Sequence, residues 1–318
     1  MAPLPTRPLG RSDLEVSVVG LGCNRIGRTV DRDGARAIVD ACDASGVTLL
    51  DTADVYGGAG ASETLLGEVL EGRRDRFVVA TKFGLELAGV DGAPDAPRGS
   101  RPYIRWAVQG SLRRLRTDRI DLYQYHRPDG VTPLEETLRA LDELVREGTV
   151  RAIGCSNFHA AQLEDAVQIA AEEGLTSFVS LQNEYNLLDR SIEADVAPLC
   201  ERHGLGILPY YPLARGLLTG KYRRGEAAPA GSRLADRDEV ADDATFDVLE
   251  ALERFAAERG VELIDVAIGG LAAQPAVASV IAGATRPEQV ERNARAASWT
   301  PSAEDLEALD AIVPPPRR

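Results

Sequence analysis

Short β-rich apolar runs alternate with longer stretches of helical periodicity along most of the chain. After a predicted hairpin at residues 7–17, eight runs have the pattern of strands, at residues 18–22, 47–51, 76–82, 119–125, 150–156, 177–182, 206–211 and 277–283. Residues 133–148 show the clearest helical pattern, with five apolar side chains at helical spacing: Leu134, Leu138, Leu141, Leu144 and Val145. Pro133 near the start and Gly148 after the end mark the boundaries of this predicted helix.

Eight alternating strands and helices predict an α/β fold, a closed parallel (β/α)8 TIM barrel with an N-terminal β-hairpin, forming one domain over residues 1–318. The alternative is an open doubly wound sheet, which uses a G-x-G-x-x-G turn after its first strand. Residues 20–27 read GLGCNRIG, so Arg25 stands in place of the third glycine. The pattern therefore favours the barrel.

Two connections are long and rich in Gly, Pro and Asp: residues 84–102 after strand three and residues 212–243 after strand seven. Both leave the carboxyl ends of strands, which is where barrel enzymes carry their sites. Loops of this length are usually functional. We expect these loops, together with residues 299–316, to line the substrate pocket.

The composition narrows the possible partners. With 318 residues, 44% of them hydrophobic and 27% charged, the chain can build a core, and its net charge is −14. This charge argues against nucleic acid and anionic membranes as partners, and it requires a locally basic pocket if the ligand is an anion. Four cysteines without a C-x-x-C pair and three scattered histidines predict free thiols and no metal site. Without an apolar run of signal-peptide or membrane-spanning length, we expect a cytoplasmic protein. The sequence predicts no particular oligomeric state.

Four polar residues stand at or just after consecutive predicted strands: Asp51, Tyr56, Lys82 and His126. Taken alone, each has an ordinary structural explanation, such as a helix cap, a packed loop side chain, a rim charge or a bond to a backbone carbonyl. At the same end of adjacent parallel strands, however, they would meet. We therefore interpret them as one catalytic group.

Such a group can transfer a proton. A tyrosine with a pKa near 10 is a poor acid at neutral pH, and a nearby ammonium lowers that pKa. We expect Asp51 to hold Lys82, Lys82 to lower the pKa of Tyr56, and Tyr56 to give or take the proton. His126 can donate a hydrogen bond to a carbonyl oxygen. Reduction of that carbonyl would also need a hydride, which a nicotinamide cofactor supplies.

Seven motifs carry a resemblance to a known family, in the order DTADVYG, ATKFG, DLYQYHRPD, GCSNF, LQNEYN, YYPLARGLLTGKY and VIAGATRPEQVERNA. Over about residues 7–312 the chain resembles the aldo-keto reductase superfamily, and in particular its bacterial NADP-dependent members. The resemblance implies a barrel that binds NADP(H) across its carboxyl-end face. It also implies reduction of a small aldehyde or ketone, such as an oxo-sugar, by a tetrad at Asp51, Tyr56, Lys82 and His126.

The resemblance further implies a set of cofactor-binding residues. From the nicotinamide through the pyrophosphate to the adenosine they are Ser156, Asn157, Gln182 and Tyr210; Leu213, Gly216, Leu218 and Lys221; and Gly283, Arg286, Gln289 and Asn293. Tyr210 would stack on the nicotinamide ring. Many members have a lysine at the position of Gly283 that binds the 2′-phosphate, so Arg286 is expected to replace it. Tyr211 stands where the family often has serine, and Asn24 and Arg25 are candidates for substrate contact.

Three other functions remain open at this point. Potassium-channel β subunits resemble this chain and bind the cofactor as regulatory proteins, but they lack the histidine at the position of His126. A sugar dehydrogenase would use the same site in the oxidative direction. A barrel lyase or isomerase could use Lys82 as a Schiff-base amine. His126 favours the reductase.

Overall fold

The computed structural model describes residues 4–87, 92–235 and 240–316 of the chain. Eight parallel strands form one sheet in the order β10-β3-β4-β5-β6-β7-β8-β9. Their bounds are β3 Val19–Gly22, β4 Leu49–Asp51, β5 Val78–Phe83, β6 Ile120–Tyr125, β7 Val150–Ser156, β8 Ser180–Gln182, β9 Gly206–Ile207 and β10 Val280–Gly283. Each strand lies within one of the eight predicted runs or extends it by a single residue. The predicted (β/α)8 barrel is therefore confirmed.

The sheet closes between its two outer strands. The amide of Ile207 donates to the carbonyl of Ala276 at 2.7 Å, and the amide of Ala278 donates back to Ile207 at 2.9 Å. The amide of Ile281 on β10 donates to the carbonyl of Pro209 at 3.0 Å. Only two residues of the predicted run 206–211 form regular strand, but the chain continues beside its neighbours, since the amides of Leu208 and Tyr210 donate to the carbonyls of Leu181 and Asn183.

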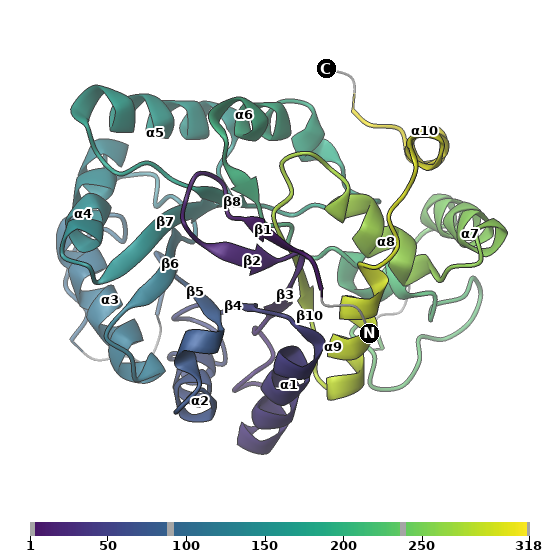
Figure 1. The fold of residues 1–318 in the computed structure, drawn as a ribbon, viewed down its shortest axis with the longest axis horizontal. Helices are drawn as coiled ribbons and strands as arrows, with labels where there is room; N and C mark the ends of the chain where they lie inside the picture. Colours follow the sequence, from purple (N-terminus) through teal and green to yellow (C-terminus); the bar gives the residue numbers. More distant parts are fainter. Residues whose placement is uncertain (1–3, 88–91, 236–239, 317–318) are drawn as a thin grey trace.

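Eight helices cover the outside of the barrel (Figure 1), at α1 Arg32–Ser45, α2 Ala61–Val69, α3 Arg101–Leu115, α4 Leu134–Arg146, α5 Ala160–Glu173, α6 Val196–His203, α8 Leu263–Ala272 and α9 Pro287–Ala296. The predicted helix at 133–148 is confirmed as α4, which begins after Pro133. Two further helices, α7 (Asp243–Glu258) and α10 (Ala303–Ile312), lie outside the ring beside α8 (Figure 1). Short 3-10 turns occur at η1 Arg74–Arg76, η2 Ser191–Glu193 and η3 Ala214–Thr219.

The predicted N-terminal hairpin is confirmed as β1 (Thr6–Pro8) and β2 (Glu15–Ser17), and it covers the amino end of the barrel (Figure 1). Its apolar side chains pack against the inward-facing residues of the strands, in one buried cluster: Leu9, Leu14, Val16, Leu49, Ala80, Leu122, Ala152, Leu208, Ala278 and Ile281. The hairpin therefore closes this end of the barrel, and any ligand must enter from the other end.

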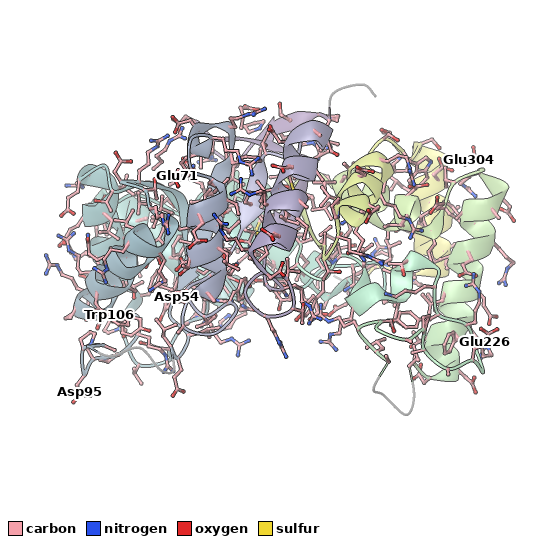
Figure 2. All side chains as sticks on the ribbon, turned by 90° about the horizontal axis from the view of Figure 1, so that it is seen from below. Asp54, Glu71, Asp95, Trp106, Glu226 and Glu304 are labelled. Carbon is pink, nitrogen blue, oxygen red and sulfur yellow. The ribbon has the colours of Figure 1, made fainter. Side chains whose placement is uncertain are left out.

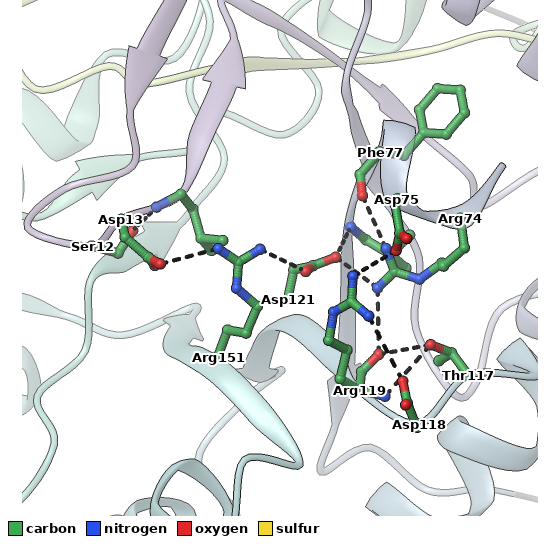
Figure 3. A network of polar contacts seen from close by, with 12 residues as sticks. Ser12, Asp13, Arg74, Asp75, Phe77, Thr117, Asp118, Arg119, Asp121 and Arg151 are labelled. Carbon is green, nitrogen blue, oxygen red and sulfur yellow. Dashed lines mark hydrogen bonds and ion pairs between the residues drawn. The ribbon is translucent and has the colours of Figure 1, made fainter.

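A buried carboxylate joins the strands at the amino end (Figure 3). Asp121 on β6 accepts hydrogen bonds from Arg74 at 2.6 Å and from the amide of Val79 at 2.9 Å. Its other oxygen accepts from Arg151 at 3.0 Å, and Arg151 continues to Asp13 in the hairpin turn at 3.1 Å. These bonds fix the hairpin and three neighbouring strand starts on the face away from the site.

The long loops follow β5 and β9, as predicted, and both leave the carboxyl-end face. In Figure 2 this face points down, with Asp95 of the first loop at the lower edge and Glu71, at the opposite end of α2, above it. Within the described residues, no helix combines the length and the apolarity that a membrane span needs. Nor do the described residues include a group of acidic, histidine and cysteine side chains that could hold a metal.

Candidate active site

Alternation along the strands brings the predicted residues to one place. Successive side chains of a strand point to opposite faces, so residues two apart share a face. Leu49, Ala80 and Leu122 point into the barrel interior. Two residues further along their strands come Asp51, Lys82 and Gln124, which therefore lie on the same inner face, one layer closer to the carboxyl end.

A cavity of about 870 Å³ opens above this layer. Fourteen of the sixteen predicted residues line it: Asp51, Tyr56, His126, Ser156, Asn157, Gln182, Tyr210, Leu213, Gly216, Lys221, Gly283, Arg286, Gln289 and Asn293. Lys82 lies directly beneath and is fully buried. Leu218 lies apart, because its fully buried side chain packs in the cluster of α7, α8 and α10. Any contact of Leu218 with a ligand would have to use its main chain.

Three of the tetrad residues form a hydrogen-bonded chain. Lys82 Nζ donates to Asp51 Oδ2 at 2.7 Å and to the carbonyl of Thr52 at 2.8 Å. It lies 3.3 Å from the phenolic oxygen of Tyr56 and 4.8 Å from the centre of that ring. All three donor positions of the ammonium are therefore used, and one of them points to the phenol.

The pKa shifts of these hydrogen-bonded residues differ in part from the expectation based on the sequence. Burial alone would lower the pKa of Lys82, but Asp51 and Tyr56 outweigh it and raise the pKa, so the lysine stays charged. Burial raises the pKa of Tyr56 above its ordinary value of 10, and Lys82 offsets only part of this rise. Lys82 thus acts in the predicted direction, but the net shift of the phenol is upward, because the hydrophobic surroundings penalise the phenolate more than one ammonium favours it.

Asp51 is held by two amides that the motif analysis did not assign to it. Its Oδ1 accepts hydrogen bonds from Gln124 at 3.1 Å and from Gln182 at 2.9 Å. With Lys82 on its other oxygen, the carboxylate is only 2% exposed yet well paired. Gln124 was detectable, because it stands two residues before His126 and alternation places both on the inner side of β6.

His126 lies beside the phenol. Its ring packs edge-on against Tyr56 with ring centres 5.8 Å apart, and its amide donates to the carbonyl of Phe83 at 2.8 Å. Burial, helped by the charges of Lys82 and Arg127, lowers the pKa of His126 to about 2. The imidazole is therefore neutral at physiological pH and can donate one hydrogen bond into the cavity. Its Nδ1 is buried and has no partner among the described residues.

The predicted nicotinamide residues form a connected group at the ends of β7 and β8. Ser156 Oγ donates to the carbonyl of Gln182 at 2.7 Å. Asn157 has a left-handed backbone with φ of 60°, which asparagine tolerates better than most residues. Its amide nitrogen donates to the carbonyl of His126 at 2.9 Å, and its oxygen accepts from the hydroxyl of Tyr210 at 2.9 Å. This backbone turn thus ties the ring of Tyr210 to the tetrad.

The lining of the cavity is basic despite the acidic chain. Seven cationic side chains line it, and the sequence analysis assigned only two of them to the cofactor: Arg25, Arg127, Arg215, Lys221, Arg233, Arg286 and Arg292. Arg233 donates to the hydroxyl of Tyr211 at 3.0 Å and stacks over its ring. Tyr211, which stands where the family often has serine, thus lines the cavity in contact with this guanidinium. If the ligand is an anion, this lining supplies the locally basic pocket that the net charge of −14 requires.

One expectation about the pocket wall is wrong, and another is met only in part by the described residues. Residues 299–316 do not line the cavity; α10 packs instead on α7 and α8, with Leu309 and Val313 buried there. Of the described part of the loop after β5, only Leu85 reaches the cavity. Residues 88–91 and 236–239 of the two long loops lie outside the described residues.

Comparison with known proteins agrees with this geometry. A model of the aldo/keto reductase family matches residues 18–314. A protein named "Probable voltage-gated potassium channel subunit beta" from Oryza sativa subsp. japonica is 37% identical over 320 residues, covering 96% of this chain and 95% of the relative. "Aldo-keto reductase YhdN" of Bacillus subtilis (strain 168) is 34% identical over 312 residues, covering 94% and 91%. The holo structure of aldo-keto reductase AKR11C1 from Bacillus halodurans superposes with a TM-score of 0.80 at 34% identity, covering 98% and 96%.

The chain therefore belongs to the aldo/keto reductase family. Family and fold together imply an oxidoreductase that acts on small carbonyl or alcohol groups with a nicotinamide cofactor.

Proposed function

We propose that this protein reduces an aldehyde or ketone to the alcohol with NADPH, and that Tyr56 provides the proton. One observation carries the proposal: the phenol of Tyr56 opens onto the cavity and lies 3.3 Å from an ammonium, which is itself fixed at 2.7 Å from a buried carboxylate. A phenol with such a partner can lose a proton without leaving an isolated negative charge in the barrel.

The residues present fit a nicotinamide dinucleotide. The cavity volume of about 870 Å³ is at the upper end of ordinary ligand sites, and its basic lining suits a polyphosphate. Tyr210 offers an aromatic ring beside Asn157, and α9 begins at Pro287 with Arg286 at its N-cap, where a helix end favours a phosphate. A reduced nicotinamide bound here supplies a hydride. We propose NADP(H) rather than NAD(H) because Arg286 can pair with the 2′-phosphate.

The chain's own residues then perform distinct tasks. The neutral ring of His126 donates a hydrogen bond that holds the carbonyl oxygen next to Tyr56. Tyr56 gives its proton to that oxygen as the alcohol forms, and Lys82 stabilises the remaining phenolate. Asp51 holds Lys82 in place, and Gln124 and Gln182 hold Asp51.

Removal of one oxygen tests the proposal. Tyr56→Phe should lower kcat for aldehyde-dependent NADPH oxidation by at least about 10²-fold, the usual contribution of a general acid, and leave the Kd for NADPH nearly unchanged. Tyr123→Phe is the matched control, because its phenol is buried in β6 and has no partner among the described residues. A panel of aromatic aldehydes, methylglyoxal, ketones and free sugars provides substrates. Wild-type turnover by Tyr56→Phe would refute the assignment of the proton donor.

The channel-subunit relatives support a second candidate, a regulatory protein that binds the cofactor without steady turnover. The two candidates differ in one measurement. Purified protein that binds NADPH but oxidises it with no carbonyl compound of the panel would favour the regulatory role. His126, which lies beside Tyr56 and lines the cavity, is the feature that favours the enzyme.

Two further expectations, on localisation and on domain organisation, belong to this proposal. Cys23, Cys42, Cys155 and Cys200 are all free and buried, as expected for a protein of a reducing compartment such as the cytoplasm. We also propose that residues 1–318 act as one barrel domain.

A further inference from the structure

Two arginines that line the cavity together with Tyr56 and His126 come from segments next to these residues. Arg127 follows His126 directly in the chain, and its charge acts on the imidazole. Arg25 lies in the turn after β3. This turn packs against the loop that carries Tyr56 so closely that a Cβ on Gly57 would lie 2.9 Å from the carbonyl of Ile26.

Neither guanidinium has an anionic partner in the part of the chain that the structure describes. Within residues 4–87, 92–235 and 240–316, no carboxylate lies at ion-pair distance from Arg25 or Arg127, although thirty such pairs occur elsewhere. Burial and the like charges of Arg233 and Arg28 lower the pKa of Arg25, so positive charge is in local excess there. In a chain of net charge −14, two unpaired cations beside the catalytic residues call for an anion from outside.

The residues proposed for the cofactor's phosphates lie elsewhere in the lining. Lys221 and Arg215 lie in the loop after β9, and Arg286 is the N-cap of α9, along the route predicted for the pyrophosphate and the adenosine. Arg127 follows His126 at the end of β6, so it lies on that side of the cavity, next to the place proposed for the substrate carbonyl and away from α9. It therefore belongs with the substrate.

We propose that the natural substrate is a carbonyl compound that carries a carboxylate or phosphate group, and that Arg127 and Arg25 bind this group next to Tyr56 and His126. This inference rests on the proposed function and specifies its substrate class. A guanidinium recognises either anion by paired hydrogen bonds, so the shared chemistry is an oxyanion on a short carbonyl compound.

Two matched substrate pairs test the inference. The carboxylate pair is 4-carboxybenzaldehyde and methyl 4-formylbenzoate; the phosphate pair is glycolaldehyde phosphate and glycolaldehyde. The wild-type protein should prefer the anionic member of at least one pair, and which pair shows it tells carboxylate from phosphate. Arg127→Gln and Arg25→Gln should each raise KM for that anionic member about tenfold, the lower end for a charged hydrogen bond, because both residues are partly solvated. The loss should be larger for the anionic member than for the neutral member, so the preference between the two should fall by about the same factor.

Two further variants act as controls. Arg127→Lys keeps the charge and should retain much of the preference, whereas Arg36→Gln removes one positive charge from the exposed face of α1, outside the cavity, and should change nothing. Equal kinetics on both members of each pair, or equal losses on both in Arg127→Gln, would overturn the inference.

Calorimetric titration with 4-carboxybenzaldehyde and glycolaldehyde phosphate separates this inference from the proposed function, since binding needs no turnover. If no carbonyl compound is reduced, the proposed function fails. Binding of either anion that Arg127→Gln weakens would still support the anion site, and binding of neither would refute it.

Discussion

Lys82 lies between a carboxylate and a phenol, so charges removed on its two sides should shift the pKa of Tyr56 in opposite directions. The ammonium of Lys82 favours the phenolate, and Asp51 opposes it. Lys82→Met should therefore raise the apparent pKa of the catalytic acid, and Asp51→Asn should lower it.

The contact distance sets the size of the first shift. At 3.3 Å and an effective dielectric constant of about 20, the attraction between an ammonium and a phenolate is roughly 5 kcal/mol, or between 3 and 4 pKa units. Solvent that enters the site reduces this value, and a single opposite charge usually shifts a pKa by about 1–3 units. The shift in Asp51→Asn should be smaller, since Asp51 contacts Lys82 rather than the phenol.

The pH dependence of kcat for alcohol oxidation gives the measurement, because in the proposed mechanism oxidation requires the phenolate, so that the rate should rise as Tyr56 deprotonates. The rising limb should move to higher pH in Lys82→Met and to lower pH in Asp51→Asn. The double variant should fall between them, because both charges are gone. Circular dichroism and NADPH binding serve as controls for folding, since Lys82→Met leaves the Asp51 carboxylate with only Gln124 and Gln182 as partners.

A shift in the same direction in both single variants would refute the electrostatic reasoning. So would an unmoved limb in Lys82→Met with intact folding, which would mean that the titrating group is not the phenol beside this lysine.

Three other outcomes are expected. Arg286→Ala should raise Kd for NADPH about tenfold to 150-fold and leave Kd for NADH nearly unchanged in fluorescence titration, as loss of a charged phosphate contact predicts; equal weakening of both cofactors would contradict it. Arg114→Met should cost about 3–5 kcal/mol in the free energy of unfolding measured by urea denaturation, since it removes the cationic partner at 2.7 Å and leaves the fully buried Glu63 with Thr81 alone; adding Glu63→Gln should recover part of the loss. Burial raises the pKa of Asp129, but hydrogen bonds from Thr132, Gly99 and Val131 outweigh this and hold it at about 2, below the usual 3.8. Its stabilising effect is thus present above about pH 4 and lost as the pH falls toward 2, so acid unfolding of Asp129→Asn should depend less on pH over this range; identical acid transitions would contradict this.

The part of the site on the strands was predictable, because a few local rules determine it. Parallel strands end on one face, and alternation then brings Asp51, Lys82 and His126 together whatever the loops do. The same rules reach Gln124. These rules do not predict the net pKa shift of Tyr56. That shift depends on how deeply neighbouring segments bury the phenol, which is a property of the whole fold.

The position of the C-terminal segment was not predictable from its own residues. Residues 299–316 are amphipathic, and such a helix can cover any apolar surface it meets. The sequence of another helix indicates which surface it covers. Helix α8 (Leu263–Ala272) is buried on nearly every side, so a second layer must lie over it. Trp299 contacts that helix so closely that a Cβ at Gly269 would lie 2.5 Å from its carbonyl. The apolar residues on all sides of α8 could therefore have indicated that another helix packs on it.

The closure of the barrel between β9 and β10 has a consequence for local opening of the structure. Within the described residues the two sides of this seam share few main-chain hydrogen bonds, those of the Ile207, Ala278 and Ile281 amides, whereas β6 and β7 pair over five residues. A ligand that reaches from Gln182 on β8 to Arg286 beyond β10 would join the two sides of the seam. Deuterium uptake at Ile207, Ala278 and Ile281 should then slow markedly on saturation with NADPH. At a ligand concentration 100 times Kd, the folded state gains about 2.7 kcal/mol. In a cell that keeps this cofactor abundant, the lifetime of the protein would follow the supply of its own reductant.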